Sequence, residues 1–420
     1  MLNEDKERLL NSDNFCMLPF IHTAFLSNGN IRPCCVYHGK PLGNLKENKI
    51  QDIIDPSINS KVKGFRNLFL LENTPLPTGC KGCVRDRTNG SSYRVMSNNR
   101  FGYLLDTFET IEDLRNNTNI YYIDMRFSNL CNLRCVYCWH FDSSRVGEDI
   151  LAGNEQIYGV YYDGKSAVGD SPLKKNFNTP EQLEDFLEFF KKNLSNLSML
   201  YFTGGEPTLV KEHYDVLELL IQAGNTDIQL MYNSNVSTKL ALGDRSIIDY
   251  WKHFSKVGIN LSIDCAGEPL EYARDGADWE LILKNVREIK KALPSVKLSM
   301  TPVVNALSIY EIPEAYHFMK SEGLVDSLNV QRVGGNEDIN AGILPERYKD
   351  EIRYLYSKYT DQYPELKYIS DVCLGEETDP SMRTDLLKKF KKRTELIKEQ
   401  RGKDFYKIFP YYKDLFNGIE

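Results

Sequence analysis

The sequence predicts an α/β protein whose main domain is a partial (β/α)6 barrel of the TIM-like type. Between residues 118 and 335, strand-like segments alternate with amphipathic helical segments, the pattern of a parallel sheet built from βαβ units. Six strand candidates occur in this stretch. A complete eight-unit barrel needs about 250 residues, so six units favour an incomplete barrel. A small cysteine-rich α+β domain is expected before it and a helical extension after it.

The six strands are predicted from short runs of aliphatic, β-branched and aromatic residues. In order, they are Ile120 to Phe127, Met199 to Thr203, Asp227 to Asn233, Ile259 to Asp264, Val296 to Val303 and Ser327 to Val333. Two of the helices between them are TPEQLEDFLEFFKKNL, which Thr179 is placed to cap ahead of Pro180, and KEHYDVLELLIQA, whose apolar residues recur at intervals of three and four.

Three cysteines with the spacing C-x3-C-x2-C directly follow the first predicted strand. They are Cys131, Cys135 and Cys138, in the segment CNLRCVYC. Three thiolates bind three irons of a cubane iron-sulfur cluster and leave the fourth iron open to another ligand, which suits chemistry rather than electron storage alone. The alternatives are a zinc site with a fourth ligand such as His140, and a set of buried thiols.

The second predicted strand runs into the segment TGGEP, with Gly204, Gly205 and Glu206 at its end. Two residues without Cβ allow the backbone to approach a ligand closely, and the carbonyl and carboxylate oxygens accept hydrogen bonds from an ammonium group. Taken alone, the segment is more typical of a turn.

Together, CNLRCVYC after one strand and TGGEP at the end of the next resemble the radical S-adenosylmethionine (SAM) enzymes over residues 118 to 335. The resemblance implies that the three cysteines hold a [4Fe-4S] cluster whose open iron binds SAM, while Gly204 to Glu206 grip the amino group of SAM. Reductive cleavage of SAM then gives a 5′-deoxyadenosyl radical that abstracts hydrogen from a substrate. This chemistry belongs to the cofactor, and the protein positions and shields it.

Polar residues also stand at the ends of the later strands, where ligands of parallel sheets collect. They are Asn233, Ser234, Asn235, Ser262, Asp264, Asn305 and Arg332. Hydroxyl, amide and carboxylate groups suit a ribose, and the arginine suits a carboxylate. The alternative is that asparagine and aspartate only terminate strands. The resemblance implies that Asn233 or Asn235, Ser262 and Asp264 neighbour SAM, more than Arg332 does.

A second set of cysteines precedes the barrel. The segment FIHTAFLSNGNIRPCCVYHG predicts a hairpin with a Ser-Asn-Gly-Asn turn, and PTGCKGC contributes Cys80 and Cys83. Adjacent strand residues face opposite ways, so only one of Cys34 and Cys35 can share a metal centre with Cys16. Four thiolates fit structural zinc or a fully ligated iron-sulfur cluster.

The order C-x16-PCC, PLGNLKENKIQDI and GCKGC resembles the SPASM/twitch auxiliary domain of radical SAM enzymes, in its one-cluster form. The resemblance favours Cys34 over Cys35 and implies an auxiliary [4Fe-4S] cluster. The family's module usually follows the barrel, whereas here it precedes it. The expected domains are therefore 1–95 (auxiliary), 118–335 (radical SAM core) and 336–420 (helical extension).

Composition narrows the class of protein. The net charge of −7, with both signs interspersed, lacks the basic footprint of extended nucleic-acid binding. No charged-then-apolar leader and no long apolar run is seen, which predicts a cytoplasmic protein without a membrane span. Cys265 and Cys373 stand alone and are expected to be core thiols, with a place near the substrate as the alternative for Cys265, which follows Asp264 at a strand end. The basic run 386–403 predicts an amphipathic packing helix, and the aromatic C-terminal end is expected to fold back onto the barrel.

The long segment 140–178 lacks a clear helix, and YGVYYDG within it is interpreted as part of a lid over the substrate.

The favoured function is a radical SAM enzyme that modifies a peptide or protein, with electrons from a flavodoxin- or ferredoxin-type donor. The alternatives are an enzyme acting on a small metabolite such as a sugar, and a non-catalytic iron-sulfur binding or electron-transfer protein. The preference for peptides rests on family analogy.

Overall fold

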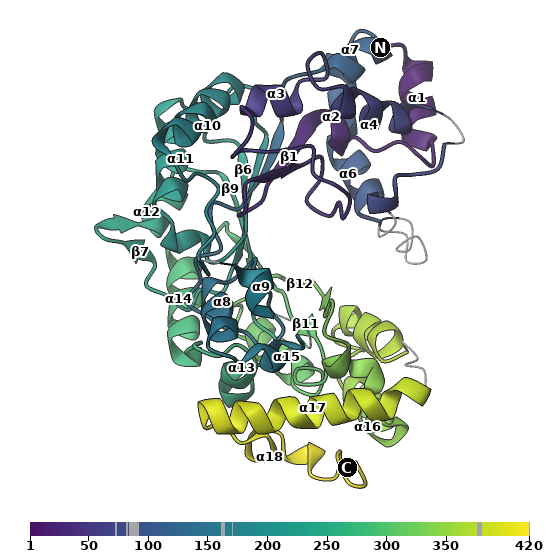
Figure 1. Cartoon of the computed structure of the whole chain (residues 1–420), viewed down its shortest axis with the longest axis vertical. Helices are drawn as coiled ribbons and strands as arrows, with labels where there is room; N and C mark the ends of the chain where they lie inside the picture. The colour runs from purple at the N-terminus through teal and green to yellow at the C-terminus, as the bar shows by residue number, and fades with distance from the viewer. Residues whose placement is uncertain are drawn as a thin grey trace. The chain divides into compact units, whose positions relative to one another are not determined.

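The computed structural model describes residues 1–71, 74–80, 83, 92–160, 164–169, 171–375 and 380–419 (Figure 1). These residues form two compact units. The first unit consists of residues 1–128, 175–204 and 212–230, and the second consists of residues 129–174, 205–211 and 231–420. Each unit is therefore assembled from segments that are distant in the sequence.

The first unit is built on a sheet in which the N-terminal hairpin lies beside strands of the predicted barrel. Its strands are β1 (His22–Phe25), β2 (Asn30–Arg32), β3 (Gly43–Asn44), β4 (Tyr122–Met125) and β5 (Met199–Phe202). Their order is β5-β4-β1-β2-β3, with β4 parallel to β5 and to β1, and β2 antiparallel to its neighbours. The predicted hairpin is confirmed, and its first strand also extends the parallel sheet in a way that no local pattern in the sequence indicates.

Helices cover this sheet. They are α1 (Asn3–Asn11), α2 (Leu18–Ile21), α3 (Ile50–Ile54), α4 (Ser60–Leu70), α6 (Tyr93–Phe101), α7 (Ile111–Asn116), α10 (Pro180–Asn193) and α11 (Lys211–Gln222). Thr179 and Gln182 form a capping box at the start of α10, as predicted for Thr179. Phe186 on α10 packs edge-on against Phe25 of β1 at 5.6 Å between ring centroids, which fixes the hairpin to the layer of helices.

The second unit contains the remaining strands of the predicted barrel. They are β6 (Gln229–Ser234, which begins in the first unit), β9 (Lys256–Leu261), β10 (Lys297–Met300) and β12 (Ser327–Leu328), with short pairs β7 (Ala241–Leu242) and β8 (Arg245–Ser246), and β11 (Val303–Val304) and β13 (Gln331–Arg332). Strand β10 is parallel to β9 and to β12. All six predicted strands are present, and the α/β class is confirmed. Within the described residues, neither unit closes into a barrel by itself.

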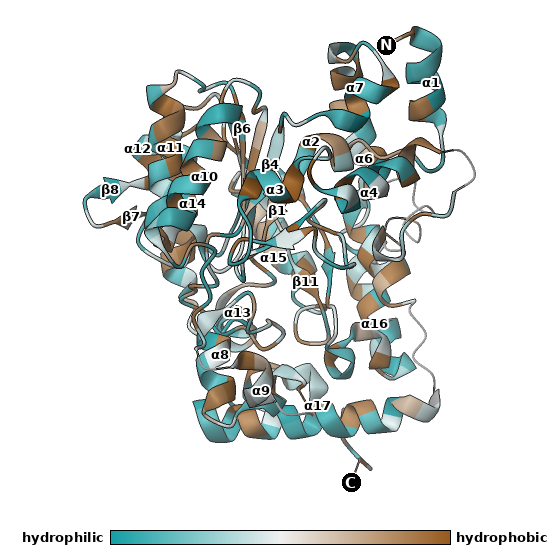
Figure 2. Ribbon diagram, turned by 45° about the horizontal axis from the view of Figure 1, so that its top comes forward, coloured by the Kyte–Doolittle hydropathy of each residue, from teal (hydrophilic) through white to brown (hydrophobic). Residues whose placement is uncertain are grey.

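The helices of the second unit come from segments before and after β6 in the sequence. They are α8 (Ser144–Leu151), α9 (Gly164–Val168), α12 (Ile247–Trp251), α13 (Gly267–Ala273), α14 (Trp279–Ala292), α15 (Ile312–Ser321), α16 (Glu346–Ser357), α17 (Pro380–Arg401) and α18 (Phe405–Ile408). Figure 2 shows brown and teal residues in turn along α17, in keeping with the predicted amphipathic helix. In the described part of the chain, every helix is too short or too polar to cross a bilayer.

The predicted lid segment is more ordered than its sequence suggests. Helices α8 and α9 and the 3-10 turn η4 (Glu155–Tyr158) occupy much of it. The Tyr158 hydroxyl donates to Asp149 at 2.5 Å, and its ring is buried, so this tyrosine belongs to the interior and not to a lid surface. The prediction of a continuous loop is wrong here, because buried polar contacts fix helices that a weak apolar pattern does not reveal. Residues 161–163 of YGVYYDG lie outside the described residues.

The C-terminal end folds back as expected. Tyr412 donates from its hydroxyl to the Ala306 carbonyl at 2.7 Å, and Phe409 packs against Tyr272 of α13 at 5.2 Å between ring centroids. Both aromatic side chains are buried. The predicted packing of the C-terminal segment onto the second unit is thus confirmed.

One buried histidine gives the first unit a predictable response to acid. His22 lies on β1 against the Tyr122 ring, at 4.2 Å between centroids, and burial lowers its pKa from 6.5 to about 4. Below pH 6.5, His22 is protonated in the unfolded chain but stays neutral in the folded chain. The free energy of unfolding therefore falls as the pH drops from 6.5 towards 4. The full loss corresponds to about 3 kcal/mol.

We expect the His22→Phe variant to lose less unfolding free energy than the wild type between pH 7 and pH 4. Urea unfolding of metal-free protein at a series of pH values measures the difference. His38→Phe, at an exposed position of the same segment, is the matched control. Equal pH dependence of wild type and His22→Phe would contradict the assignment.

Candidate functional site

The three thiols of the C-x3-C-x2-C motif are brought together in the second unit. Burial, with a smaller contribution from the neighbouring Cys135, raises the pKa of Cys131 to about 12. Burial also raises the pKa of Cys138 well above its usual value, with additional contributions from Cys135 and Cys131. Cys131 and Cys138 are therefore both close enough to Cys135 to be affected by its charge. Cys135 is buried and Cys131 and Cys138 are half-buried, so the three thiols are costly to ionise unless a positive group takes up their charge.

The backbone of the cysteine loop is held by short local bonds. Ser143 donates from its hydroxyl to the Leu133 carbonyl at 2.7 Å, and the Cys138 N–H donates to the Cys135 carbonyl at 3.0 Å. The Leu133 N–H points to the Cys131 sulfur at 3.5 Å. An N–H aimed at sulfur favours the thiolate, which is the form that binds iron.

Gly205 is required by contact with this loop. A Cβ built on Gly205 would lie 2.1 Å from the carbonyl oxygen of Leu130, which is the residue before Cys131. The Glu206 N–H donates to the same carbonyl at 2.7 Å. Gly204 has a φ of +110°, which other residues rarely adopt, and a Cβ there would lie 2.8 Å from the Ser128 carbonyl oxygen. The double glycine thus serves close backbone packing beside the cysteines.

The Glu206 carboxylate is already engaged by protein groups. It accepts hydrogen bonds from the Thr208 hydroxyl at 2.8 Å, the Ser234 hydroxyl at 2.9 Å and the Asn235 N–H at 2.9 Å. Burial raises the pKa of Glu206, and these bonds oppose that rise. The side chain therefore ties the residues after β5 to the end of β6.

Asn235 also reaches the cysteine loop. Its Nδ2 donates to Oδ1 of Asn132 at 2.9 Å. Asn233 accepts from Asn260 at 3.0 Å, and Ser262 is half-buried, with its N–H on the Ser234 carbonyl at 2.8 Å. Asn235 is thus one of the predicted strand-end residues whose side chain contacts the loop.

Directly after Asn235, the backbone of Val236 has a φ of +44°. A β-branched residue in this region is strained, and such strain persists only where the surroundings impose it. Asn285 donates to the Val236 carbonyl and to the Thr238 carbonyl, both at 2.7 Å. Neither Val236 nor Asn285 carries a signal in the sequence that indicates this role.

Asp264 is enclosed by protein donors. Arg274 binds it in a two-pronged ion pair, with Nε at 2.9 Å from Oδ2 and Nη2 at 2.8 Å from Oδ1. The Val303 N–H donates to Oδ1 at 2.8 Å, and the Tyr137 hydroxyl donates to Oδ2. Asp264 is fully buried, and both of its carboxylate oxygens accept from these protein groups. The geometry favours a supporting role over direct binding.

Arg274 was not found by sequence reasoning, because it lies outside every motif. It is buried, and its positive charge opposes the upward shift that burial gives to the pKa of Cys135. Its guanidinium also lies 5.5 Å from the centroid of the Tyr137 ring. Asp264, Arg274 and Tyr137 therefore form a charged network behind the middle cysteine.

The other strand-end residues do not join this group. Asn305 is buried, and its side chain closes a turn through Val303 and Leu307, both at 2.8 Å. Arg332 is exposed on β13 and donates to the Tyr368 hydroxyl at 3.1 Å. Cys265 and Cys373 are buried thiols, as expected. For Asn305 the turn interpretation fits the observed contacts.

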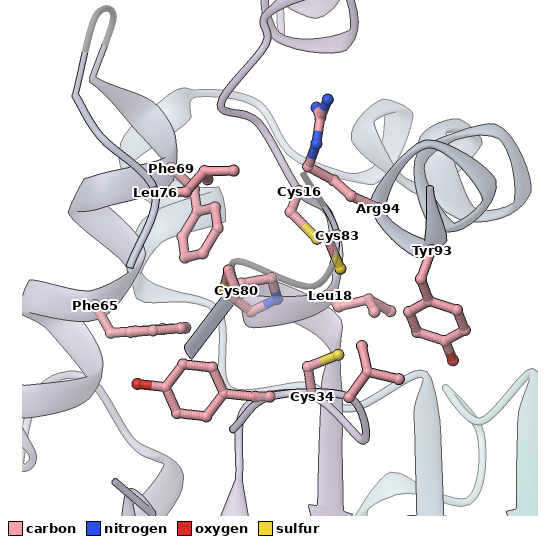
Figure 3. Close-up of a pocket in the computed structure, with 13 residues that line it drawn as sticks. Cys16, Leu18, Cys34, Phe65, Phe69, Leu76, Cys80, Cys83, Tyr93 and Arg94 are labelled. Atoms are coloured by element: carbon pink, nitrogen blue, oxygen red, sulfur yellow. The ribbon is translucent and has the colours of Figure 1, made fainter. Parts of the chain in front are cut away.

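The N-terminal cysteines form a second cluster in the first unit (Figure 3). Cys16, Cys34, Cys80 and Cys83 line one pocket, whose other lining residues are mostly apolar and include Leu18, Phe65, Phe69 and Leu76. Burial raises the pKa of Cys16 and that of Cys80 to about 12. Four thiols around one apolar space fit a fully ligated centre.

Helix α6 fixes the backbone around Cys16. Arg94 donates to the Phe15 carbonyl at 2.9 Å, Asn98 donates to the same carbonyl at 3.0 Å, and the Met17 N–H donates to Asn98 at 2.9 Å. The Arg94 charge also lowers the pKa of Cys16 against the larger effect of burial. The residues on both sides of the cysteine are thus immobilised.

Cys34 and Cys35 lie just after β2 (Asn30–Arg32) and not within a returning strand, so the predicted alternation of strand residues does not separate them. The Cys35 thiol donates to the Tyr93 hydroxyl at 3.2 Å, and that hydroxyl lies 3.3 Å from the Tyr122 hydroxyl. Cys34 lines the pocket and Cys35 does not appear in its lining. The choice of Cys34 as the ligand stays a prediction with this geometry in its favour.

Within the described residues, no three His, Cys, Asp or Glu side chains converge closely enough for one metal ion. In a cubane, each thiolate binds a different iron. Both sets of cysteines offer the donors such clusters take, three at one site and four at the other. Structural zinc at the N-terminal site stays open and is decided by metal analysis.

Comparison with known families assigns both regions. The radical SAM superfamily model matches residues 125–319, and the model of the SPASM iron-sulfur cluster-binding domain matches residues 16–84. A radical SAM domain implies a [4Fe-4S] cluster and SAM, and a SPASM domain implies auxiliary iron-sulfur clusters. The predicted resemblance to both families is confirmed.

Curated relatives are distant. A cysteine-type anaerobic sulfatase-maturating enzyme from Clostridium novyi is 23% identical over 261 residues, covering 58% of this chain and 60% of the relative. The radical SAM cyclopropyl synthase TigE from Paramaledivibacter caminithermalis is 23% identical over 250 residues, covering 57% and 46%. The match thus spans about half to three fifths of the length of these relatives.

Similar solved structures include anSMEcpe with bound AdoMet and a Cp18Cys peptide. It is 17% identical, covers 63% of this chain and 68% of its own, and has a TM-score of 0.38. Streptococcus suis SuiB bound to the precursor peptide SuiA is 15% identical, covers 71% and 63%, and has a TM-score of 0.39.

We expect Gly205→Ala to weaken the cysteine loop, because the added methyl group collides with the Leu130 carbonyl. Overpacking of this kind costs roughly 1 to 3 kcal/mol. Iron bound at the three-cysteine site should fall while the N-terminal site stays loaded, and iron analysis after anaerobic reconstitution measures both. Gly64→Ala is the control, since a Cβ there meets no atom within 4 Å. Full iron binding and wild-type stability in Gly205→Ala would contradict the close-packing role.

The two neighbouring cysteines give a matched pair for the N-terminal site. We expect Cys34→Ser to remove about four irons per chain and Cys35→Ser to leave the iron content unchanged. Metal analysis of the reconstituted variants also reports zinc directly. The opposite outcome would make Cys35 the ligand, and stoichiometric zinc in place of iron would overturn the assignment of an iron-sulfur cluster.

Proposed function

The chain carries the radical SAM domain of an enzyme and a SPASM domain ahead of it, and we propose that it cleaves SAM reductively to abstract hydrogen from a peptide or protein. The observation that carries the proposal is the set of three thiols on one loop, Cys131, Cys135 and Cys138, next to the Leu130 carbonyl that contacts Gly205 and Glu206. A cluster bound there supplies one-electron chemistry that yields the 5′-deoxyadenosyl radical.

The residues of the chain hold and orient the reactants in this proposal. The amino group of SAM is gripped by the segment from Gly204 to Glu206, chiefly through its backbone, because the Glu206 carboxylate is bonded to Thr208, Ser234 and Asn235. Asn233, Asn235 and Ser262 face the ribose. Asp264 acts indirectly, by fixing Arg274 and Tyr137 behind Cys135.

The N-terminal site completes the enzyme. Cys16, Cys34, Cys80 and Cys83 hold an auxiliary [4Fe-4S] cluster in a pocket lined mainly by apolar side chains. Such a pocket excludes water and so influences the potential of a cluster. The electron donor is of the flavodoxin or ferredoxin type, and the enzyme works in the reducing cytoplasm, where thiols stay reduced.

A peptide or protein substrate is favoured over a small metabolite by analogy with the sulfatase-maturating relative, whose name states that it acts on a sulfatase. A candidate peptide is tested by deuterating it and following transfer of the label into 5′-deoxyadenosine. Label from the peptide supports the assignment. Unlabelled 5′-deoxyadenosine, with the peptide unchanged, would redirect the search to small metabolites.

The function itself is tested by formation of 5′-deoxyadenosine. We expect anaerobically reconstituted, reduced protein to produce it from SAM, and Cys135→Ala to produce none, because two thiolates cannot hold the cluster in its site. Liquid chromatography with mass detection measures the product. Failure of the wild type, loaded with both clusters and supplied with its peptide, would favour a binding or electron-transfer protein.

A further inference from the structure

Helix α17 (the long yellow helix in Figure 1) carries Arg393, whose fully buried side chain contacts the cysteine loop. Arg393 donates from Nη1 to the carbonyl of Val136, between the second and third cysteines, at 3.3 Å. Its Nη2 donates to Asp338 at 2.7 Å and to Asn336 at 3.1 Å. Asn336 in turn donates to the Tyr137 carbonyl at 3.3 Å. Two successive carbonyls of the loop therefore accept from one network.

A second arginine on the same helix reaches the loop further along. Arg401 approaches the Arg134 carbonyl at 3.5 Å and donates to Asp149 at 2.8 Å and to the Tyr158 hydroxyl at 2.7 Å. Its side chain is 2% exposed. Positions 393, 397 and 401 follow one stripe of the helix at intervals of four, and Ile397 between the arginines is also buried.

The N–H groups of the same loop segment are bound on its other edge. The Arg134 N–H donates to the Asp275 carbonyl and the Val136 N–H donates to the Ala273 carbonyl, both at 2.9 Å. The segment from Arg134 to Val136 is thus held through its N–H groups by the end of α13 and through its carbonyls by α17. Cys135 lies between these anchored residues.

The guanidinium of Arg393 is packed closely against neighbouring backbone. A Cβ on Gly159, which has a φ of +69°, would lie 2.4 Å from Nη2 of Arg393 and 2.8 Å from Oδ1 of Asn336. The turns η4 and η6 (Glu337–Ile339) both pack against α17. A buried guanidinium is tolerated only when it is paired and hydrogen-bonded, and Asp338 supplies the opposite charge.

We propose that Arg393 and Arg401 are positioning residues that hold the three-cysteine loop in the conformation in which its cluster keeps one iron open for SAM. The inference rests on the proposed function. In this proposal α17 both covers the core and positions the cysteine loop. A helix that only covered the core would use apolar side chains at these positions. Charged groups reaching backbone carbonyls beside ligands fix the ligands' positions.

The test compares Arg393→Met and Arg401→Met with Lys392→Met, an exposed neighbour on the same helix. Iron content, the electron paramagnetic resonance spectrum of the reduced protein with and without SAM, and the melting temperature are measured. We expect both arginine variants to keep the N-terminal cluster and to lose the spectral change that SAM induces, or to require at least tenfold more SAM for it. Lys392→Met should match the wild type.

Arg393→Lys, which keeps the charge and one donor, should recover part of the response to SAM. Wild-type spectra and SAM dependence in both methionine variants would overturn the proposal. Loss of both clusters together with the folded structure in Arg393→Met, Arg401→Met and Arg393→Lys alike would also overturn it, because the arginines would then serve general stability. None of these readouts needs turnover, so absence of 5′-deoxyadenosine in the wild type would count against the proposed function alone.

Discussion

The architecture of the candidate site depends on one backbone contact, in which Gly205 lies where any side chain would meet the Leu130 carbonyl at 2.1 Å. The same carbonyl accepts from the Glu206 N–H, and the Glu206 carboxylate then binds Ser234 and Asn235. The loop that carries the cysteines is thereby fixed to the segment after β5 and to the end of β6 through consecutive short bonds. These bonds use backbone groups and buried side chains, so the contact leaves little freedom to the residues that carry it.

Both cysteine sites are stabilised by the same kind of interaction. Arg94 binds the Phe15 carbonyl next to Cys16, and Arg393 binds the Val136 carbonyl next to Cys135. Thiols whose pKa burial raises, as it does for both cysteines, must release protons when they bind iron. The charge of Arg94 favours the thiolate of Cys16 and that of Arg274 favours the thiolate of Cys135, while Arg94 and Arg393 fix the backbone beside these cysteines.

Local features could be predicted from the sequence, and distant pairings could not. The strands, the N-terminal hairpin, the Thr179 cap and the cysteine spacing each depend on a few consecutive residues. The shared edge of β1 and β4, the enclosure of Asp264 by Arg274, and the bond from Arg393 to Val136, which spans 257 residues, depend on the finished fold. Asp264 illustrates the difference, since a carboxylate at a strand end suggests a ligand until its donors are seen to be protein groups. The strained backbone of Val236 could not be predicted from the sequence either, because valine is an ordinary residue for a strand end.

The separation of Arg393 from Val136 has a consequence for biosynthesis. Chains grow at about 5 to 20 residues per second, so the arginine is made roughly 13 to 50 s after the loop that it supports. The residues that line the N-terminal pocket, from Cys16 to Arg94, are all complete before the loop is made. The order of translation therefore allows the N-terminal cysteines to come together first, whereas the three-cysteine loop gains its bond from Arg393 only after α17 has been made.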